Sequence, residues 1–497
     1  MQNKIAKEAS LSFAGMTFGQ VVRYLFTILV SRLAGAELLG FYAIGNTITR
    51  LSEVTAKMGL DEGVLKFVSR DSSDRDSVLN SIGTAIKFSL LGSIVLMLLQ
   101  FFFSDWLAVH FFNEVDPYLV LILKCYALSI PFASLMSIMA NSTQGYKTLR
   151  YKILVTEVLN SSFLLTFFIF LGLVLNYKFA ILFSPLITMV SAFVAIGIVL
   201  FKKFDISPIN IIKSSMDYTL VSFSIPIMFA AVISTLLHWI DIIMIGAFLD
   251  VTEVGLYHPA ARTSGLIRVI FISFASIFSP IISELHAKKD FSTMNYYFKL
   301  VTRWILIITI PVVILFLLVP EKIMLIFGPE FSQTKSAFSI LVFSAFIQAL
   351  FGLGGSALVM TGYSKINLYN IIFAIILNIA INFILIPKIG LEGAAIGTLC
   401  ALLTIGVLRL VENIYLNNLF PFNFHNFKPI IAGSLTFGII YYSSIVSLVD
   451  GFASVLFLAM VVSIVFIFIV YLIGFENEEK DVIKSTIQAI KEKFNER

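Results

Sequence analysis

Charged side chains inside long apolar runs are the residues of this chain best placed to do chemistry. Arg23 and Arg50 lie near the amino terminus, Asp241 lies near the middle, and Arg262 and Arg268 follow it. On insertion scales, a charged residue at the centre of a membrane helix costs about 3 kcal/mol. We therefore expect these side chains to face a polar interior, where the fork of an arginine suits the oxygens of a phosphate.

Helical spacing gathers the polar residues of these runs into stripes. Residues three, four, seven or eleven positions apart lie on one face of a helix. Three stripes follow this spacing: Gln20, Arg23, Thr27 and Ser31; Asn46, Arg50, Glu53 and Lys57; and Ser234, His238 and Asp241. Arg262 and Arg268 are six residues apart, which places them about 120° from each other on a helix. Both side chains could therefore be accommodated only by a broad cavity or by a contact with another helix.

The sign of these charges indicates the ligand. Cations outnumber acids by five to two when Arg23, Arg50, Lys57, Arg262 and Arg268 are set against Glu53 and Asp241. Ion pairs between helices or within one helix are the alternative, such as Arg50 with Glu53 or Asp241 with an arginine. Pairing would still leave about three positive charges, and the stripes therefore predict a site for a phosphate or pyrophosphate group.

Two further residues, His238 and Glu157, could exchange a proton or bind an ion. His238 stands close to Asp241, whose charge would shift its titration, and Glu157 lies inside another apolar run. A core histidine, and an acid that reaches the membrane surface, are the alternatives. No cofactor is indicated. Cys125 and Cys400 lie inside apolar runs, so neither a disulfide framework nor a metal cluster is expected.

The elements that must position these residues are membrane helices. Of 497 residues, 58% are hydrophobic and 13% are charged, whereas soluble domains carry about 25% charged residues. Fourteen apolar runs are each long enough to cross a bilayer: 10–33, 40–60, 82–104, 118–140, 153–175, 179–200, 218–246, 254–282, 298–319, 336–360, 366–387, 391–416, 427–449 and 452–474. The sequence therefore predicts an all-α polytopic membrane protein.

Lysines and arginines set the orientation of this bundle. With the amino terminus in the cytoplasm, cytoplasmic segments hold about 23 of these residues and external segments about 5. We expect both termini in the cytoplasm and a location in the inner (cytoplasmic) membrane. The first run carries Arg23 at its middle and no small-residue cleavage site, so it is expected to stay as a helix. The net charge of +5 mostly reflects this orientation, and nucleic acid is not expected as a partner.

Short motifs recur at a constant offset and divide the chain. LGFY at 39–42 opens the second run and VGLY at 254–257 opens the eighth, 215 residues later. Runs one to six therefore repeat as seven to twelve. The predicted organisation is an amino-terminal lobe, a cytoplasmic linker, a second lobe, two added helices and an amphipathic cytoplasmic tail, at 1–200, 201–216, 217–418, 427–474 and 475–497.

These motifs carry a resemblance to a known family. The stretch from Ser224 to Arg262, with its VGLY motif, resembles the seventh and eighth helices of polysaccharide-type lipid-linked oligosaccharide flippases. These proteins belong to the multidrug/oligosaccharidyl-lipid/polysaccharide (MOP) exporter superfamily. LGFY, QGY from Gln144, FGPEF from Phe327 and LEGAAIGT from Leu391 agree with the same pattern.

The resemblance implies a fold and an activity. Two six-helix lobes, like those of MATE transporters and MurJ, would surround a cationic cavity. By alternating access they would move an undecaprenyl-diphosphate-linked or dolichol-phosphate-type glycan, such as an O-antigen or capsule repeat unit, to the outer leaflet. The phosphate would lie on Arg23, Arg50, Lys57, Arg262 and Arg268. Asp241, Glu53, His238 and Glu157 would couple an ion, H⁺ or Na⁺, or balance charge. Partners would be the lipid-linked glycan, membrane lipids and glycan polymerase or assembly proteins.

Three alternatives compete with this function. A lipid II flippase shares the predicted topology and cationic cavity. A drug or cation antiporter of the same superfamily needs acidic residues in its lobes, whereas the central set here is basic. A membrane glycosyltransferase or glycan ligase needs catalytic residues in long external loops, and the external segments here are only about a dozen residues long. An enzyme is therefore not expected.

Overall fold

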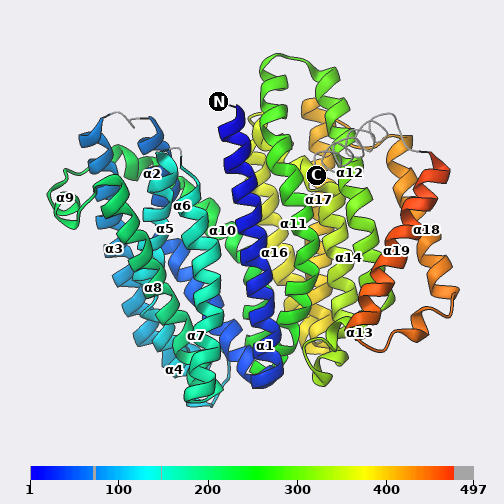
Figure 1. Ribbon diagram of the computed structural model, residues 1–497, viewed down its shortest axis with the longest axis horizontal. Helices are drawn as coiled ribbons and strands as arrows, with labels where there is room; N and C mark the ends of the chain where they lie inside the picture. Colours follow the sequence, from blue (N-terminus) through cyan, green and yellow to red (C-terminus); the bar gives the residue numbers. More distant parts are fainter. Residues whose placement is uncertain (1, 71–73, 147, 475–497) are drawn as a thin grey trace, which may run out of the picture. The chain divides into compact units, whose positions relative to one another are not determined.

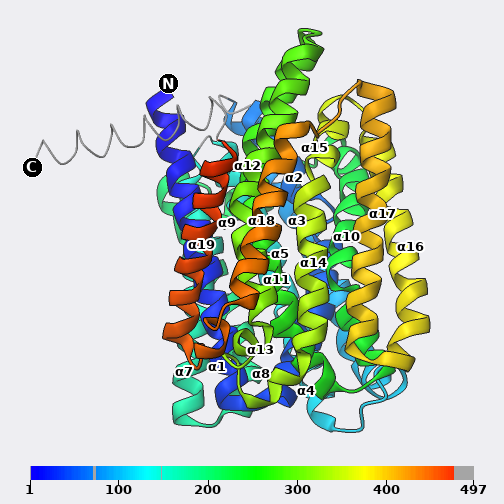
Figure 2. The same cartoon turned by 90° about the vertical axis from the view of Figure 1, so that its right-hand side faces the viewer.

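The chain is a bundle of membrane-length helices, and the predicted all-α class is confirmed. The computed structural model describes residues 2–70, 74–146 and 148–474 (Figures 1 and 2). Among these residues no β-strand forms, and twelve helices are long and apolar enough to cross a membrane. The predicted amphipathic tail at 475–497 lies outside the described residues.

Helices follow one another with short connections along the described chain. The first half contains α1 (Gln2–Ala56), α2 (Leu60–Arg70), α3 (Arg75–Trp106), η1 (Leu107–Phe111), α4 (Pro117–Ala127), α5 (Ile130–Gly145), α6 (Arg150–Ile153), η2 (Leu154–Leu159), α7 (Asn160–Val174), α8 (Tyr177–Phe204) and α9 (Pro208–Lys213). The second half contains α10 (Tyr218–Phe248), α11 (Val251–Ala287), α12 (Phe291–Leu318), α13 (Pro320–Met324), η3 (Pro329–Thr334), α14 (Lys335–Phe351), α15 (Leu353–Met360), α16 (Ser364–Ile389), α17 (Leu391–Asn417), α18 (Phe424–Tyr442), η4 (Val446–Leu448) and α19 (Phe452–Ile473).

The first two predicted runs form the single long element α1, which is broken at Gly35. There the backbone has φ 83° and ψ 176°, a conformation that glycine adopts without steric penalty. Just past the break, the Ala36 N–H donates a 2.9 Å hydrogen bond to Oε1 of Glu330. Phe327 and Phe331 flank this glutamate and are fully buried. A segment nearly 300 residues away in sequence therefore caps the second part of α1.

The merged α1 and the element α18 explain why twelve candidate spans are found where the sequence predicts fourteen. The span at 12–56 covers two predicted runs. Helix α18 is not among the candidate spans, although it covers most of the thirteenth predicted run, and it carries Lys428 and Pro429. Fourteen crossings stay a prediction.

By its contacts, the chain divides into two compact units. Unit 1 comprises Met1–Pro259, Phe327–Phe331 and Ile379–Ala394, and unit 2 comprises Ala260–Ile326, Ser332–Asn378 and Ala395–Arg497. Both units exchange chain segments, because α11, α16 and α17 each contribute to both. The predicted lobe boundaries at 200 and 217 stay a prediction.

In unit 1, α5 lies among α2, α3 and α8, and α7 pairs with α8 (Figure 1). Ile82, Ile138, Val155 and Ile196 are among the buried residues that form its core. Burial of each such side chain stabilises the fold by about 1.5 to 3 kcal/mol where water is the alternative. This core includes residues of α2, α5 and η2, the elements that carry Asp61, Ser137 and Glu157.

The predicted linker at 201–216 is fastened to α3 of the same unit. Nζ of Lys87 donates to the carbonyl oxygen of Ser214 at 2.6 Å, and the Ser215 N–H donates to Oδ1 of Asn80 at 2.9 Å. Gly83 faces this contact: a Cβ there would lie 1.8 Å from Oγ of Ser214. The linker is thus an ordered part of unit 1.

The two repeated motifs pack directly on each other in unit 1. A Cβ at Gly40 would lie 1.8 Å from the carbonyl oxygen of Val251, and a Cβ at Gly255 would lie 1.8 Å from the carbonyl oxygen of Ala36. Each pair of related positions, 36 with 251 and 40 with 255, is 215 residues apart. The contact is therefore reciprocal, as a local two-fold relation between the motifs requires, and only glycine permits this approach of two helix backbones.

Unit 2 has its own core around α12. Helices α14, α18 and α19 pack on α12, and α18 and α19 lie side by side (Figure 2). Phe278, Phe298 and Ile305 are buried in the adjoining cluster. Pro311 lies inside α12, where the missing N–H weakens the helix ladder.

Candidate functional site

Arg23, the first predicted phosphate ligand, forms an ion pair with Glu157. Its Nη2 lies 2.6 Å from Oε2 of the carboxylate, and about a quarter of each side chain remains exposed, 25% and 23%. Glu157 belongs to η2, a single π-helical turn between α6 and α7. Turns of this kind are frequent at functional sites, because they shift the side chains of one helix face.

Arg50, Glu53 and Lys57 form a second group at the end of α1. Nη1 of Arg50 lies 2.7 Å from Oε2 of Glu53, and Nζ of Lys57 lies 3.6 Å from Oε1 of the same carboxylate. Lys57 also pairs with Asp61 of α2 at 3.0 Å. Only 5% of the Glu53 side chain is exposed, whereas 49% of the Arg50 side chain is. Glu53 is thus a buried counter-charge, and Arg50 keeps an accessible guanidinium.

Asp61 and Ser137 extend this group, and the sequence analysis did not single them out. Oδ2 of Asp61 accepts a 3.3 Å hydrogen bond from the Ser137 hydroxyl, and Oδ1 accepts one from the Glu62 N–H. Burial disfavours the carboxylate of Asp61, yet the Lys57 ammonium and these hydrogen bonds hold its pKa below the ordinary value. Asp61 stands four residues after Lys57, and this spacing could have predicted their ion pair from the sequence.

Lys152 adds one more cation, held by amide side chains. Its Nζ donates to Oδ1 of Asn141 and to Oε1 of Gln144, both at 2.7 Å. The polar run 141–144 at the end of an apolar segment is the signal from which the sequence could have predicted this contact.

The predicted cations of unit 1 are therefore balanced. Arg23, Arg50 and Lys57 face Glu157, Glu53 and Asp61, three charges against three. The sequence analysis assigned Glu157 to ion coupling and did not include Asp61. Lys152, which the prediction did not include, is a further cation of unit 1, and its two hydrogen-bond acceptors are neutral amides.

Asp241 accepts two hydrogen bonds from neutral donors. The Tyr257 hydroxyl donates to Oδ2 at 2.9 Å, and the Asn382 side-chain amide donates to Oδ1 at 2.9 Å. Tyr257 is the last residue of the VGLY motif, and the sequence analysis missed both donors. His238 on the same helix is exposed, and its Nδ1 lies 2.7 Å from the carbonyl oxygen of Ser234.

Arg262 and Arg268 both lie on the part of α11 that belongs to unit 2, and both are half-buried. For Arg268, no ion pair or hydrogen bond is found within the described part of the chain. Its guanidinium is thus a cation without the acidic neighbour that Arg23 and Arg50 have.

A further polar cluster lies elsewhere in unit 2. Nε of Arg409 donates to Oδ1 of Asn367 at 2.9 Å, and the Asn370 amide donates to Oε2 of Glu412 at 2.6 Å. Gly355 leaves room for the guanidinium, since a Cβ there would lie 2.7 Å from Cζ of Arg409. Arg409 therefore packs between helices of unit 2.

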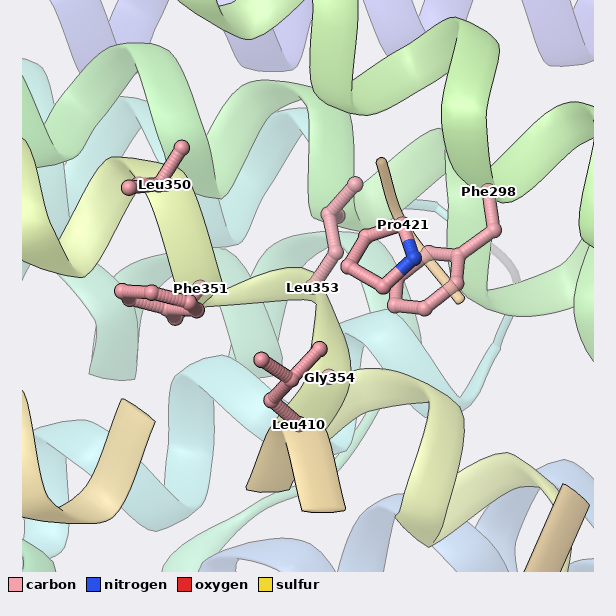
Figure 3. Close-up of a pocket in the computed structure, with 7 residues that line it drawn as sticks. All are labelled: Phe298, Leu350, Phe351, Leu353, Gly354, Leu410 and Pro421. Atoms are coloured by element: carbon pink, nitrogen blue, oxygen red, sulfur yellow. The ribbon is translucent and has the colours of Figure 1, made fainter. Parts of the chain in front are cut away.

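The pocket beside this cluster is lined by apolar residues, glycine and proline. Figure 3 shows apolar side chains around it, among them Phe298, Phe351, Leu353 and Leu410. No charged residue lines it. Among the described residues, no group of three or more His, Cys, Asp or Glu side chains is arranged to hold a metal ion. The candidate residues are therefore the charged groups of α1, η2 and α10 in unit 1 and, separately, those of α11 in unit 2.

The model of a protein family described as polysaccharide biosynthesis protein matches residues 29–336. An uncharacterised membrane protein of Methanocaldococcus jannaschii, MJ1068, is 23% identical over 98% of this chain and 99% of its own length. The probable flippase AglR of Haloferax volcanii is 30% identical over 35% of this chain and 37% of its own length.

Two solved structures have the same fold. The lipid II flippase MurJ, in an inward closed conformation, superposes with a TM-score of 0.73 over 93% of this chain and 98% of its own, at 16% identity. An inward-facing multidrug resistance MATE family transporter of the MOP superfamily gives a TM-score of 0.70 over 82% of this chain and 98% of its own, at 15% identity. The predicted MATE/MurJ-like fold is confirmed.

Proposed function

Because the chain belongs to the polysaccharide biosynthesis protein family, we propose that it is a flippase that moves a lipid-linked glycan across its membrane. The family and the superfamily whose fold it shares are transporters and flippases and not enzymes, as predicted. Similarity to AglR, a probable flippase, supports this function. The polyprenyl (di)phosphate-linked glycan would pass to the outer leaflet by alternating access, with both termini in the cytoplasm.

The observation that carries this proposal is the set of guanidinium groups on membrane-length helices. Arg50 keeps half of its side chain accessible, and Arg268 has no acidic partner in the described part of the chain. Arginine binds phosphate through parallel hydrogen bonds. We assign the phosphate of the substrate to Arg23, Arg50, Lys57, Arg262 and Arg268. A cation antiporter would instead need uncompensated acids.

The acidic residues receive different roles in this proposal. Glu53 is buried between two cations and balances their charge. Asp241 is bonded to a hydroxyl and an amide, which are ligands that a small cation also uses. We propose Asp241 as the residue that couples H⁺ or Na⁺, with His238 beside it. Transport of the lipid-linked glycan by Asp241→Asn should therefore lose its dependence on an ion gradient.

Complementation of a deletion strain tests the phosphate assignment. Arg50→Ala and Arg262→Ala should abolish glycan display at the cell surface, and lipid-linked glycan should accumulate on the cytoplasmic leaflet. Membrane levels of both proteins should match the wild type. Lys288→Ala is the matched control, because this exposed lysine just past α11 lies outside the proposed site. Full glycan display from both arginine variants would refute the assignment.

A further inference from the structure

Glu157 is positioned on Arg23 by close backbone packing. Gly19 lies one helical turn before Arg23 on α1, and a Cβ there would lie 2.8 Å from the carbonyl oxygen of Glu157. Gly15, one turn earlier, likewise makes room for Ile153, since its Cβ would lie 2.2 Å from Cγ2 of that residue. The two glycines let α1 approach the π-helical turn to a distance that any larger residue would prevent.

A local hydrogen bond also engages the π-helical turn. The Ser161 hydroxyl, four residues further along the same helix, donates to the carbonyl oxygen of Glu157. The backbone of Glu157 is therefore packed on α1, and its carboxylate meets the guanidinium of Arg23 at 2.6 Å. A surface ion pair forms between two mobile side chains and needs no such backbone packing. The pair between Arg23 and Glu157 is therefore more closely positioned than a surface ion pair.

The pair is nevertheless open to a competitor. About a quarter of each side chain is exposed, whereas the Glu53 side chain is 5% exposed. Arg50 and Lys152 also lie within electrostatic range of Glu157, and Arg50 is itself paired with Glu53. An anion that enters this region would therefore meet several cations, of which Arg23 is the one that Glu157 occupies.

We propose that Glu157 is an internal counter-ion, which occupies Arg23 in the substrate-free protein and is displaced by the diphosphate of the substrate. The proposal rests on the flippase function. A carboxylate and a phosphate both bind the same fork of a guanidinium, so the two compete for Arg23. Displacement weakens substrate binding, and return of Glu157 to Arg23 helps release. Glu157 is thus a specificity and positioning residue rather than a permanent structural partner.

A double-mutant cycle on the full-length purified protein tests this competition, with farnesyl diphosphate as the probe. Glu157→Gln should tighten binding of the probe about fivefold, the equivalent of about 1 kcal/mol for a partly exposed ion pair. Arg23→Gln should weaken binding, and Glu157→Gln should have no further effect in its presence. Glu37→Gln is the control, because it removes the same charge from an exposed position of α1.

Different results separate the inference from the flippase function. Unchanged or weaker binding by Glu157→Gln, together with weaker binding by Arg23→Gln, would overturn the counter-ion and leave the phosphate assignment intact. The same fivefold gain in the Arg23→Gln background, or in Glu37→Gln, would also overturn it, since the effect would then come from net charge. Failure of the wild type to bind the probe would overturn both proposals. Thermal melting of each variant confirms that it is folded.

Discussion

Helices α1 and α11 carry their membrane-embedded cations in different surroundings. Along α1, Arg23 and Arg50 each lie less than 3 Å from a carboxylate. On α11, Arg268 is half-buried and has no ion pair in the described part of the chain. The second part of α1 and the start of α11 nevertheless carry related motifs that pack on each other. Related motifs in a repeat can thus supply the same scaffold while one helix neutralises its charges and the other carries a cation without an acidic partner.

The most severe way to break this arrangement is to separate the two motifs. Gly40→Leu would drive a side chain into the carbonyl group of Val251, which lies 1.8 Å from the position of a Cβ. We expect loss of the folded protein, measured as loss of a monodisperse peak after detergent extraction. Gly197→Leu is the matched control, because a Cβ there meets nothing within 4 Å. A folded Gly40→Leu protein would show that the helices can move apart at this crossing.

A smaller effect is expected when the buried counter-charge of α1 is removed. Glu53→Gln leaves Arg50 and Lys57 without their shared carboxylate, and loss of one partner of a buried pair costs about 3 kcal/mol. The melting temperature in detergent should therefore fall clearly. Glu62→Gln, at an exposed position of α2, should leave it unchanged. Equal melting of the wild type and Glu53→Gln would mean that the ion pairs of α1 contribute nothing to stability.

The smallest effect on stability, with the opposite sign, is expected on α11. Arg268→Gln removes a half-buried charge that has no acidic partner, so the melting temperature should stay equal or rise. Glycan display should fall at least tenfold, because the proposed phosphate loses a ligand worth about 1.5 to 3 kcal/mol. Reduced stability with full glycan display would show that Arg268 is a structural residue. The cations of α1 and α11 would then both serve stability, contrary to the comparison above.

Much of the fold follows from the sequence because apolar length and the constant offset of the motifs are local signals. Glycine in LGFY and VGLY marks two places where backbones meet, and both were visible as a repeat. The break at Gly35 lies between the first two predicted runs, 10–33 and 40–60, and only the group that caps it was not predicted. Its cap comes from Glu330, and no local pattern connects residues so far apart.

The candidate site was predicted less completely, because charge pairing depends on neighbours from other helices. The Arg50 and Glu53 pair lies within one helix and was foreseen as an alternative. The partner of Arg23 is Glu157, which a π-helical turn brings to α1, and periodicity at 3.6 residues per turn does not reveal such a turn. Tyr257 of α11 and Asn382 of α16 donate hydrogen bonds to Asp241. The sequence analysis predicted neither contact.

The cap on α1 has a consequence for synthesis of the protein. Unit 1 contains the helices before Pro259, yet Phe327–Phe331 and Ile379–Ala394 also belong to it. Domains usually fold in the order of their synthesis. Here the Ala36 N–H receives its cap only after Glu330 has been synthesised. A fragment that ends in the linker therefore lacks part of unit 1.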